Sequence, residues 1–479
     1  MTPNQYTPEE PNSSIATALA PAALGIVRVS GKGCIELVSK VFSRPKALLE
    51  APGNTLVYGW IQDSSDQKID EVMLAVYRAP KSFTGEDMVE IFCHGGPAVV
   101  TAIQNLMLKS GFRQANRGEY TFRAFINGKT DLTKAEAVKE IIDSHTDVSR
   151  SHAAGRLAGS LFEEIDSIKK LIIDTLAAIE VEIEYPEDEE TIADSFDRKD
   201  IELAASRLEA LAKSWQGEKL YQDGARVVLA GRTNAGKSSL FNAILKEERA
   251  IVSDIEGTTR DWLESWASIN GIPVRLFDTA GLRETSDVIE AQGVEISRNL
   301  VHDADVVLYL VDSQSGLNDE DKEFIDKSEE PLIVVFTKID KMDCHGHFAA
   351  QSTLAITNNP SLHAHSSSLR AEGEAIRIPI SSHTGEGLSD LFTQITAILT
   401  AGLSTERTQA GLGSARQKES VSAALESVRH ALVSADDNYT LDAVVQDLED
   451  ALDSLGEVTG DVTPDDVLGS IFANFCVGK

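Results

Sequence analysis

The stretch ARVVLAGRTNAGKSSL, residues 225–240, decides the fold of the central part of this chain. It begins with a short run rich in valine and leucine, which is typical of a buried strand. The pattern G-x-x-x-x-G-K-S then runs from Gly231 to Ser238, the spacing of a phosphate-binding loop that opens a helix. Glycines let several backbone N–H groups face one anion, and the helix dipole adds to their field. We expect Lys237 to contact the β- and γ-phosphates of a nucleotide and the Ser238 hydroxyl to bind Mg²⁺.

Three further motifs follow apolar, strand-like runs: Asp278-Thr279-Ala280-Gly281, Thr337-Lys338-Ile339-Asp340 and Ser381-Ser382-His383. The first would place a carboxylate at the metal and a glycine amide near the γ-phosphate. Asp340 can accept hydrogen bonds from N1 and the exocyclic amine of guanine, which adenine cannot offer. The third motif would support the base from its other side. Four such motifs in this order indicate a GTPase domain, and Asp340 disfavours an ATPase.

Composition limits the class of protein. The chain has 479 residues, enough for about three domains. Its 76 acidic and 44 basic residues give a formal charge of −32, which argues against a large basic nucleic-acid footprint on this chain alone. The four cysteines show no zinc-site spacing, which favours a reducing compartment. No apolar run has membrane-spanning length, and the first residues do not resemble a signal or transit peptide. We therefore expect a soluble cytoplasmic protein without a membrane partner.

The pattern along the chain predicts α/β domains combined with an α-helical domain. Residues 1–130 contain alternating, strand-like runs and form a mixed α/β domain. Apolar residues recur at helical spacing in residues 131–221 and again in residues 401–479. Residues 222–400 form the GTPase domain, a P-loop, Ras-like fold with a mostly parallel sheet and helices on both faces. Helices that stop before this domain and resume after it predict that it is inserted into the helical domain.

Polar residues stand inside two strand-like runs of the first domain. Arg28 lies between Val27 and Val29, and Glu90 lies between Val89 and Ile91. One interpretation is an outward-facing charge on a strand whose side chains alternate between two faces. The other is that Arg28 and Glu90 line a pocket together with Lys129. Cys476 is likewise either an inert surface cysteine or a candidate reactive thiol.

The chain resembles the MnmE (TrmE) family of tRNA modification GTPases over essentially its whole length. The blocks that carry the resemblance are GIVRVSG (25–31), SFTGEDMVEIFCHGG (82–96), NGKTDLTKAEAV (127–138), GRTNAGKSSLFNAI (231–244), SDIEGTTRD (253–261), DTAGLRETSDVIEAQG (278–293) and FCVGK (475–479). The phosphate loop alone would indicate only a GTPase. The N-terminal blocks and the FCVGK segment make the resemblance far more specific.

The resemblance implies an N-terminal folate-binding domain, a helical domain with the GTPase domain inserted into it, and a homodimer formed through the N-terminal domains. It also implies a FAD-dependent partner, MnmG, in a heterotetramer that modifies C5 of the wobble uridine (U34) of certain tRNAs. The one-carbon unit would come from a tetrahydrofolate derivative in its 5-formyl or methylene form. The tRNA would bind mainly through the partner. By position, the family's folate-contacting residues correspond to Arg28, Glu90, Lys129 and Lys479, and its C-terminal cysteine corresponds to Cys476.

The resemblance also implies a mechanism of GTP hydrolysis. Leu282 stands where other GTPases carry a water-orienting glutamine, and Glu290 matches the family's catalytic glutamate, which would act with Lys237. A potassium ion would replace an arginine finger, held by Asn234, Ser253, Ile255 and Thr258, and Thr259 would join Ser238 on Mg²⁺. The residues expected to bind GTP are Asn234, Ala235, Gly236, Lys237, Ser238, Ser239, Ser253, Thr258, Thr259, Asp278, Thr279, Ala280, Gly281, Thr337, Lys338, Asp340, Ser381, Ser382 and His383.

Two departures from the family pattern qualify these expectations. Thr337 stands where the family usually has asparagine, which removes an amide that braces the phosphate loop and contacts guanine N7. Residues 18–24 lack the glycine-rich run often found before GIVRVSG, which makes folate affinity less secure than the GTPase activity. Two alternative functions are a GTP-dependent switch or scaffold of the ribosome-assembly type, and a one-carbon enzyme resembling glycine-cleavage aminomethyltransferases in which GTP is purely regulatory.

Overall fold

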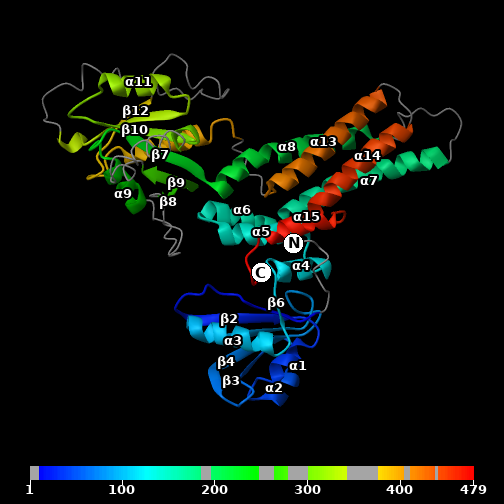
Figure 1. Ribbon diagram of the computed structural model, residues 1–479. Helices are drawn as coiled ribbons and strands as arrows, with labels where there is room; N and C mark the ends of the chain where they lie inside the picture. Colours follow the sequence, from blue (N-terminus) through cyan, green and yellow to red (C-terminus); the bar gives the residue numbers. More distant parts are fainter. Residues whose placement is uncertain are drawn as a thin grey trace. The chain divides into compact units, whose positions relative to one another are not determined.

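The computed structural model describes residues 10–184, 196–247, 264–278, 300–341, 376–403, 410–436 and 441–479. The chain divides into two compact units (Figure 1). The first is made of Met1–Lys139, Arg156–Glu209 and Ala415–Lys479, and the second of Glu140–Gly155 and Ala210–Ser414. Among the described helices, none is both long enough and apolar enough to cross a lipid bilayer.

The first unit contains a six-stranded sheet in the order β3-β4-β5-β2-β1-β6. Its strands are β1 (Asn12–Ile15), β2 (Ala22–Ser30), β3 (Thr55–Gln62), β4 (Lys68–Tyr77), β5 (Met88–Gly95) and β6 (Arg113–Gln114). All neighbours are antiparallel except β1 and β6, which are parallel. The short helices α1 (Cys34–Ser39) and α2 (Pro45–Leu49) precede β3, and α3 (Pro97–Lys109) contributes Val100, Ile103 and Met107 to the core of the sheet.

The two faces of this sheet differ because side chains alternate along each strand. Val27 and Val29 of β2 and Ile91 of β5 are fully buried in the core that α3 covers. Arg28 and Glu90 pair directly across these two strands and lie on the opposite face. The polar residues inside the strand-like runs are therefore on the face that does not contact α3.

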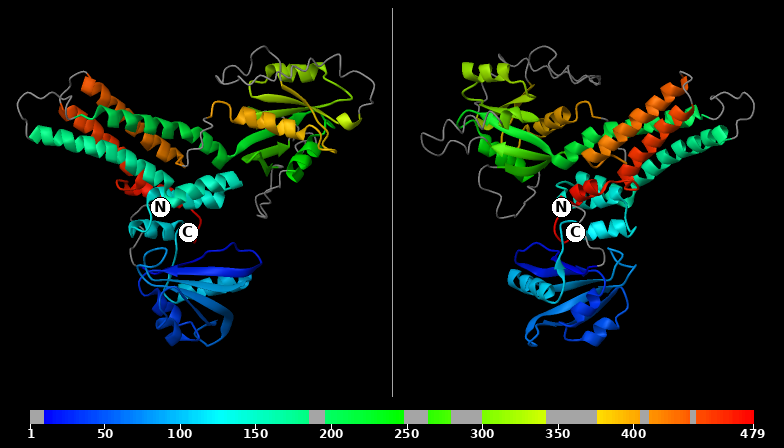
Figure 2. Two further views of the ribbon diagram at one scale, coloured as in Figure 1. Left: turned by 180° about the vertical axis from the view of Figure 1, so that it is seen from behind. Right: turned by 45° about the vertical axis from the view of Figure 1, so that its right-hand side comes forward.

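The other helices described outside the GTPase fold range from 8 to 26 residues in length. They are α4 (Glu119–Ile126), α5 (Leu132–Asp143), α6 (Asp147–Ala158), α7 (Ser160–Glu184), α8 (Arg198–Asp223), α13 (Ala415–Asp436), α14 (Leu441–Thr459) and α15 (Asp465–Ala473). The predicted apolar stripe of α7 is real, since Leu161, Ile165, Ile168, Ile172 and Ile179 are fully buried. Figure 2 shows α14 beside α13 and α7, the helices against which it packs.

Glycines set the ends of two of these helices. The stretch after residue 130 is not one continuous helix, because Gly159 adopts a φ of +111° and separates α6 from α7. Helix α8 ends at Asp223, where Gly224 follows with a φ of +71°. A glycine with positive φ is the usual way for a helix to end.

The second unit contains a six-stranded sheet in the order β12-β11-β10-β7-β9-β8. Its strands are β7 (Ala225–Gly231), β8 (Glu264–Ile269), β9 (Ile272–Asp278), β10 (Val306–Asp312), β11 (Leu332–Thr337) and β12 (Ile376–Pro379). All pairs are parallel except β8 with β9. The helical elements are α9 (Lys237–Glu247), α11 (Asp319–Lys327), the 3₁₀ helix η3 (Ile339–Lys341) and α12 (Leu388–Leu399). Buried clusters on both faces of the sheet explain the nearly continuous apolar strand sequences.

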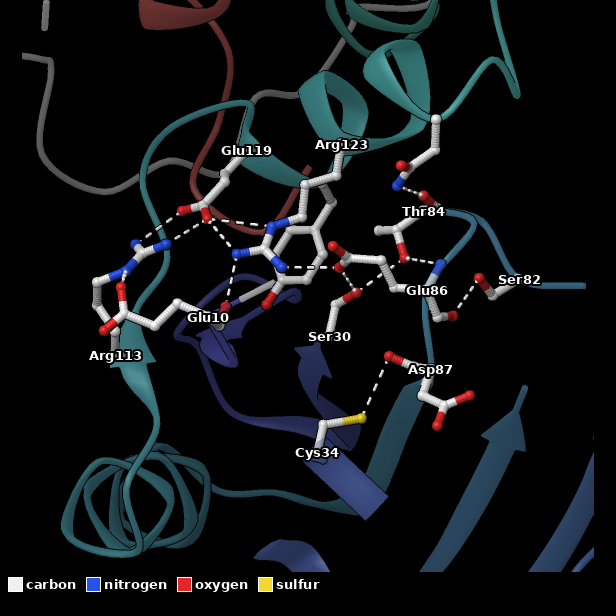
Figure 3. Close-up of polar contacts among 12 residues, drawn as sticks. Glu10, Ser30, Cys34, Ser82, Thr84, Glu86, Asp87, Arg113, Glu119 and Arg123 are labelled. Carbon is white, nitrogen blue, oxygen red and sulfur yellow. Dashed lines mark hydrogen bonds and ion pairs between the residues drawn. The ribbon is translucent and has the colours of Figure 1, made fainter. Parts of the chain in front are cut away.

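A buried ionic cluster joins the N-terminal sheet to α4 (Figure 3). Arg123, which is fully buried, pairs with Glu86 at 2.7 Å and with Glu119 at 2.8 Å. Arg113 pairs with the other side of Glu119, and Arg123 also donates to the backbone oxygen of Glu10. We call these five residues the Arg123 cluster. A buried charge requires a partner of opposite charge. Removing one partner therefore destabilises the protein by far more than the intact pair stabilises it.

We predict that Glu119 makes the N-terminal domain sensitive to acid. Burial alone would raise the pKa of Glu119, but hydrogen bonds from Arg113 and from the Asn116 backbone, with the charge of Arg123, lower it to about 2. The contribution to stability is therefore complete above the ordinary carboxyl pKa and is lost as the pH falls toward about 2, a total of about 3 kcal/mol.

The measurement is urea denaturation from about pH 7 down to about pH 2.5, followed by Trp60 fluorescence in a background with the other three tryptophans replaced by phenylalanine. Glu119→Gln is expected to be less stable at neutral pH and to lose much less stability on acidification. Glu36→Gln, at an exposed position of α1, serves as the control and should follow the parent chain. An equal pH dependence in Glu119→Gln and the parent would contradict the prediction.

Candidate functional site

The phosphate loop lies between β7 and α9, at the carboxyl ends of the parallel strands. Gly231 has a φ of +131°, and a Cβ there would lie 2.4 Å from the backbone oxygen of Leu310, so only glycine fits. The Lys237 ammonium donates to the backbone oxygens of Gly231 and Arg232, both at 2.8 Å. The buried lysine is thus held at the mouth of the loop, from where it can reach a phosphate.

Ser238 and Asp278, two of the residues predicted to lie at Mg²⁺, form a site that fits a magnesium ion. The Ser238 hydroxyl, in the first turn of α9, donates to Asp278 Oδ2 at 2.9 Å. Asp278 is the last residue of β9 and is buried. A hydroxyl and a carboxylate side by side at a helix N-terminus are oxygen ligands of the kind that Mg²⁺ prefers.

The outer side of the loop is braced by the motif Thr337-Lys338-Ile339-Asp340. The Thr337 hydroxyl donates to the backbone oxygen of Ala235 at 2.8 Å. Lys338 donates to the backbone oxygen of Asn234 and to Asp312 Oδ2, each at 2.7 Å. The brace expected to be missing without asparagine is therefore supplied by the threonine hydroxyl, and that part of the expectation is wrong. Sequence reasoning missed Asp312, although its place at the end of an apolar strand was a usable signal.

The residues predicted to read the base meet on neighbouring loops. Asp340 lies in η3, and the Ser381 hydroxyl donates to its Oδ1 at 2.7 Å. The same hydroxyl accepts the backbone N–H groups of His383 and Thr384. The hydrogen bond from Ser381 lowers the pKa of Asp340, which keeps the carboxylate ionised. An ionised carboxylate can only accept hydrogen bonds, as recognition of the guanine N–H groups requires. Ser239 and Ser382 lie in the adjoining turns, at the start of α9 and beside Ser381.

The other predicted residues of the GTPase site lie outside the part of the chain that the structure describes. They are Ser253, Ile255, Thr258, Thr259, Thr279, Ala280, Gly281 and Glu290.

A second polar site lies on the N-terminal sheet. Arg28 donates to Glu90 Oε1 through Nε at 2.9 Å and through Nη2 at 2.7 Å. The Tyr77 hydroxyl donates to the other oxygen of Glu90 at 3.2 Å. The guanidinium also lies 5.4 Å from the ring centre of Tyr120 and 5.8 Å from that of Phe83. Arg28 is therefore not an isolated outward-facing charge, and sequence reasoning missed the aromatic residues around it.

Residues 476–479 lie against this site. Arg28 Nη1 donates to the backbone oxygen of Gly478 at 2.9 Å, and the Tyr120 N–H donates to that of Lys479 at 3.2 Å. Gly478 has a φ of +99°, and a Cβ there would lie 2.7 Å from the backbone oxygen of Ile15. Burial and the charge of Arg28 lower the pKa of Lys479, while the nearby Cys476 is exposed. The structure thus brings together Arg28, Glu90 and Lys479.

Lys129 lies on a neighbouring loop rather than beside Arg28. Its ammonium donates to the backbone oxygen of Pro80 at 3.0 Å. Asn127, two residues earlier, donates through its side chain to the backbone oxygen of Thr84. These contacts hold the segment that carries Phe83, so Lys129 borders the site through that segment.

Comparisons with known proteins agree over the whole length of the chain. The family model of the MnmE helical domain matches residues 132–476, and the model of the GTP-binding protein TrmE N-terminus matches residues 13–129. The tRNA modification GTPase MnmE of Treponema denticola is 50% identical over 99% of both chains. That of Carboxydothermus hydrogenoformans is 40% identical over 98% of this chain and 100% of its own. The crystal structure of Era from Aquifex aeolicus bound to GDP·AlF₄⁻ is 25% identical, with a TM-score of 0.27, and the match covers 42% of this chain and 66% of that one.

We predict that the Thr337 hydroxyl contributes measurably to nucleotide affinity. Thr337→Val keeps the shape of the side chain but leaves the Ala235 oxygen without its donor, so the dissociation constant for GDP is expected to rise about fivefold. Fluorescence titration with a labelled GDP analogue measures this constant. Thr393→Val is the matched control, because it removes a hydroxyl that donates to the Ser389 backbone oxygen at an exposed position of α12, and it should bind like the parent. Unchanged affinity in Thr337→Val would show that the brace is not used.

Proposed function

Because the chain belongs to the MnmE family of tRNA modification GTPases, we propose that it is a potassium-activated GTPase that modifies C5 of the wobble uridine of certain tRNAs with a folate one-carbon unit. It acts with a FAD-dependent partner of the MnmG kind in a heterotetramer, and most of the tRNA contact belongs to that partner. The observation that carries the folate part of the proposal is the convergence of Arg28, Glu90 and residues 476–479 on one sheet face.

The chain's own residues divide the work of GTP hydrolysis between them. Lys237 and the loop N–H groups bind the phosphates, and Asp340 selects guanine. Glu290 orients the attacking water, because the apolar Leu282 cannot do so. Ser238 and Thr259 hold Mg²⁺, and the potassium ligands are those that the family resemblance implies: Asn234, Ser253, Ile255 and Thr258. The two cations, when bound, neutralise the negative charge that develops on the phosphate oxygens.

The second site suits a flat heterocycle such as the pterin ring of a tetrahydrofolate derivative. A guanidinium and a carboxylate side by side offer both donors and acceptors in one plane. Phe83, which is exposed, adds aromatic surface beside the guanidinium, whereas Tyr120 contacts the guanidinium but is fully buried. Lys479 adds a positive charge, and Lys129 borders the site through the Phe83 segment. Cys476 is a candidate reactive thiol at its edge.

A row of apolar side chains on the same sheet face supports a homodimer formed through the N-terminal domains. Tyr58, Met73, Phe92 and Ile26 pair in succession across β3, β4, β5 and β2. Tyr58 and Met73 are 53% and 45% exposed, which is high for residues in the middle of a sheet. A second copy that covers this row would bury it and would also close over the Arg28–Glu90 pair. We further propose that the GTPase domain is inserted into the helical domain and that the protein works in the cytoplasm, where its tRNA substrates are.

We predict that GTP hydrolysis depends on potassium. The rate in potassium buffer should exceed that in sodium buffer of equal ionic strength by about tenfold or more, because a cation stands in for an arginine finger. Glu290→Ala should remove most of the potassium-stimulated rate, and Glu426→Ala, at an exposed position of α13, should leave it unchanged. Equal, slow rates of GTP hydrolysis in both salts would contradict this mechanism and favour the switch or scaffold alternative.

We predict that folate binding needs the Arg28–Glu90 pair. Glu90→Gln removes the charge that fixes the guanidinium, so the affinity for 5-formyltetrahydrofolate in isothermal titration calorimetry should fall about tenfold or more. GTP hydrolysis should change little, because the pair is not part of the phosphate or base site. Glu36→Gln is the control with the same chemical change at an exposed position of α1. Parent-like affinity in Glu90→Gln would place the folate elsewhere.

A further inference from the structure

The second residue of the phosphate loop, Arg232, has contacts that the functions above do not use. Its guanidinium donates to the backbone oxygen of Gly316 at 2.9 Å and pairs with Asp321 Oδ2 at 2.9 Å. Gly316 and Asp321 belong to the segment that leaves β10 and begins α11. The side chain of Arg232 is thus tied to the start of a helix that follows it by almost ninety residues in the sequence.

Asp321 is held in place from several sides. Its side chain is only 1% exposed, Oδ1 accepts the Tyr309 hydroxyl at 2.8 Å, and Oδ2 accepts the Asn318 N–H at 2.9 Å. Its own N–H donates to Asn318 Oδ1 at 2.8 Å, which completes a capping box at the N-terminus of α11. Burial and the hydrogen bond to Asp321 raise the pKa of Tyr309, so the phenol stays protonated and donates. The carboxylate therefore offers Arg232 a rigid, buried anchor.

The main chain of Arg232 contacts Lys237, the lysine that we expect to bind the phosphates. Its backbone oxygen accepts a hydrogen bond from the Lys237 ammonium at 2.8 Å. Thr337 and Lys338 hold the later part of the loop through the oxygens of Ala235 and Asn234. The Arg232 side chain holds the beginning of the loop in a similar way, through its contacts with Gly316 and Asp321 near the start of α11. The loop is therefore braced at both ends, and only the first brace is a charged pair with a buried carboxylate.

We propose that Arg232 is a positioning residue of the nucleotide site and that Asp321, through this pair, makes the N-terminus of α11 a structural part of that site. The pair fixes the peptide that begins the phosphate loop, and with it the direction of the loop N–H groups and of Lys237. Without the pair the loop samples other conformations, and binding must first select the competent one. GDP and GTP would weaken alike, because both use the same loop.

The test is a double-mutant cycle on the full chain with Arg232→Met, Asp321→Asn and the double variant. Asp321→Asn removes the charge but keeps an oxygen for the Asn318 N–H. Each single change is expected to raise the dissociation constant for a fluorescent GDP analogue, and the KM for GTP, about tenfold, with kcat changed less than about threefold. The double variant should be no weaker than the worse single variant, and Arg232→Lys should recover most of the affinity.

Controls separate positioning from general damage. Lys327→Met removes an exposed ion pair with Glu323 at the other end of the same helix and should leave the GDP affinity within about twofold of the parent. Circular dichroism and the number of GDP sites at saturation establish that each variant is folded at the temperature of the titration. Where Arg232→Met fails this check, Arg232→Lys and Asp321→Asn provide the comparison with the parent.

Two results would overturn the proposal. One is a GDP affinity within about twofold of the parent in folded Arg232→Met or Asp321→Asn. The other is a double variant whose loss equals the product of the two single losses, because independent residues would not form one brace. Neither result would bear on potassium dependence or folate binding, which are measured with different ligands and different variants.

Discussion

The pairing of buried carboxylates with arginines is the interaction on which this structure most depends. Two of these pairs join segments that are distant in sequence: Arg123 joins α4 to Glu86 in the loop before β5, and Arg416 joins α13 to Glu136 of α5. A buried charge is tolerated only with its partner, so each pair admits one arrangement of the segments that it joins. Apolar packing supplies most of the stabilisation, but it is less selective, because apolar side chains can pack in several ways.

The two candidate sites are built in different ways on the two sheets. In the GTPase fold, the parallel strands β7, β9, β10 and β11 end at one edge of the sheet and deliver the residues of the site there. In the N-terminal domain, the antiparallel strands β2 and β5 place Arg28 opposite Glu90 in register. The first site therefore depends on loops after strands and the second on side chains within strands. For this reason the first site has contiguous sequence motifs, whereas the second has only single polar residues inside strands.

The phosphate loop and the base-reading aspartate were predictable, because each is encoded in a short, contiguous motif, whereas the strand order of the GTPase fold was not predicted. The face occupied by Arg28 and Glu90 also followed from strand alternation, although two interpretations were open. The brace from the Thr337 hydroxyl was not predicted, since a hydroxyl can replace an amide only if the backbone brings it close enough. The pairing of Arg232 with Asp321, like the approach of Tyr120 and Phe83 to Arg28, depends on tertiary contacts that no local pattern records.

The contact between Arg28 and Gly478 spans 450 residues of sequence. During synthesis, the N-terminal sheet emerges from the ribosome long before residues 476–479 exist. The surface around Arg28 and Glu90 must therefore persist, unfinished, while the rest of the chain is translated. The site around Arg28 and Glu90 therefore cannot be completed until translation has passed residue 478.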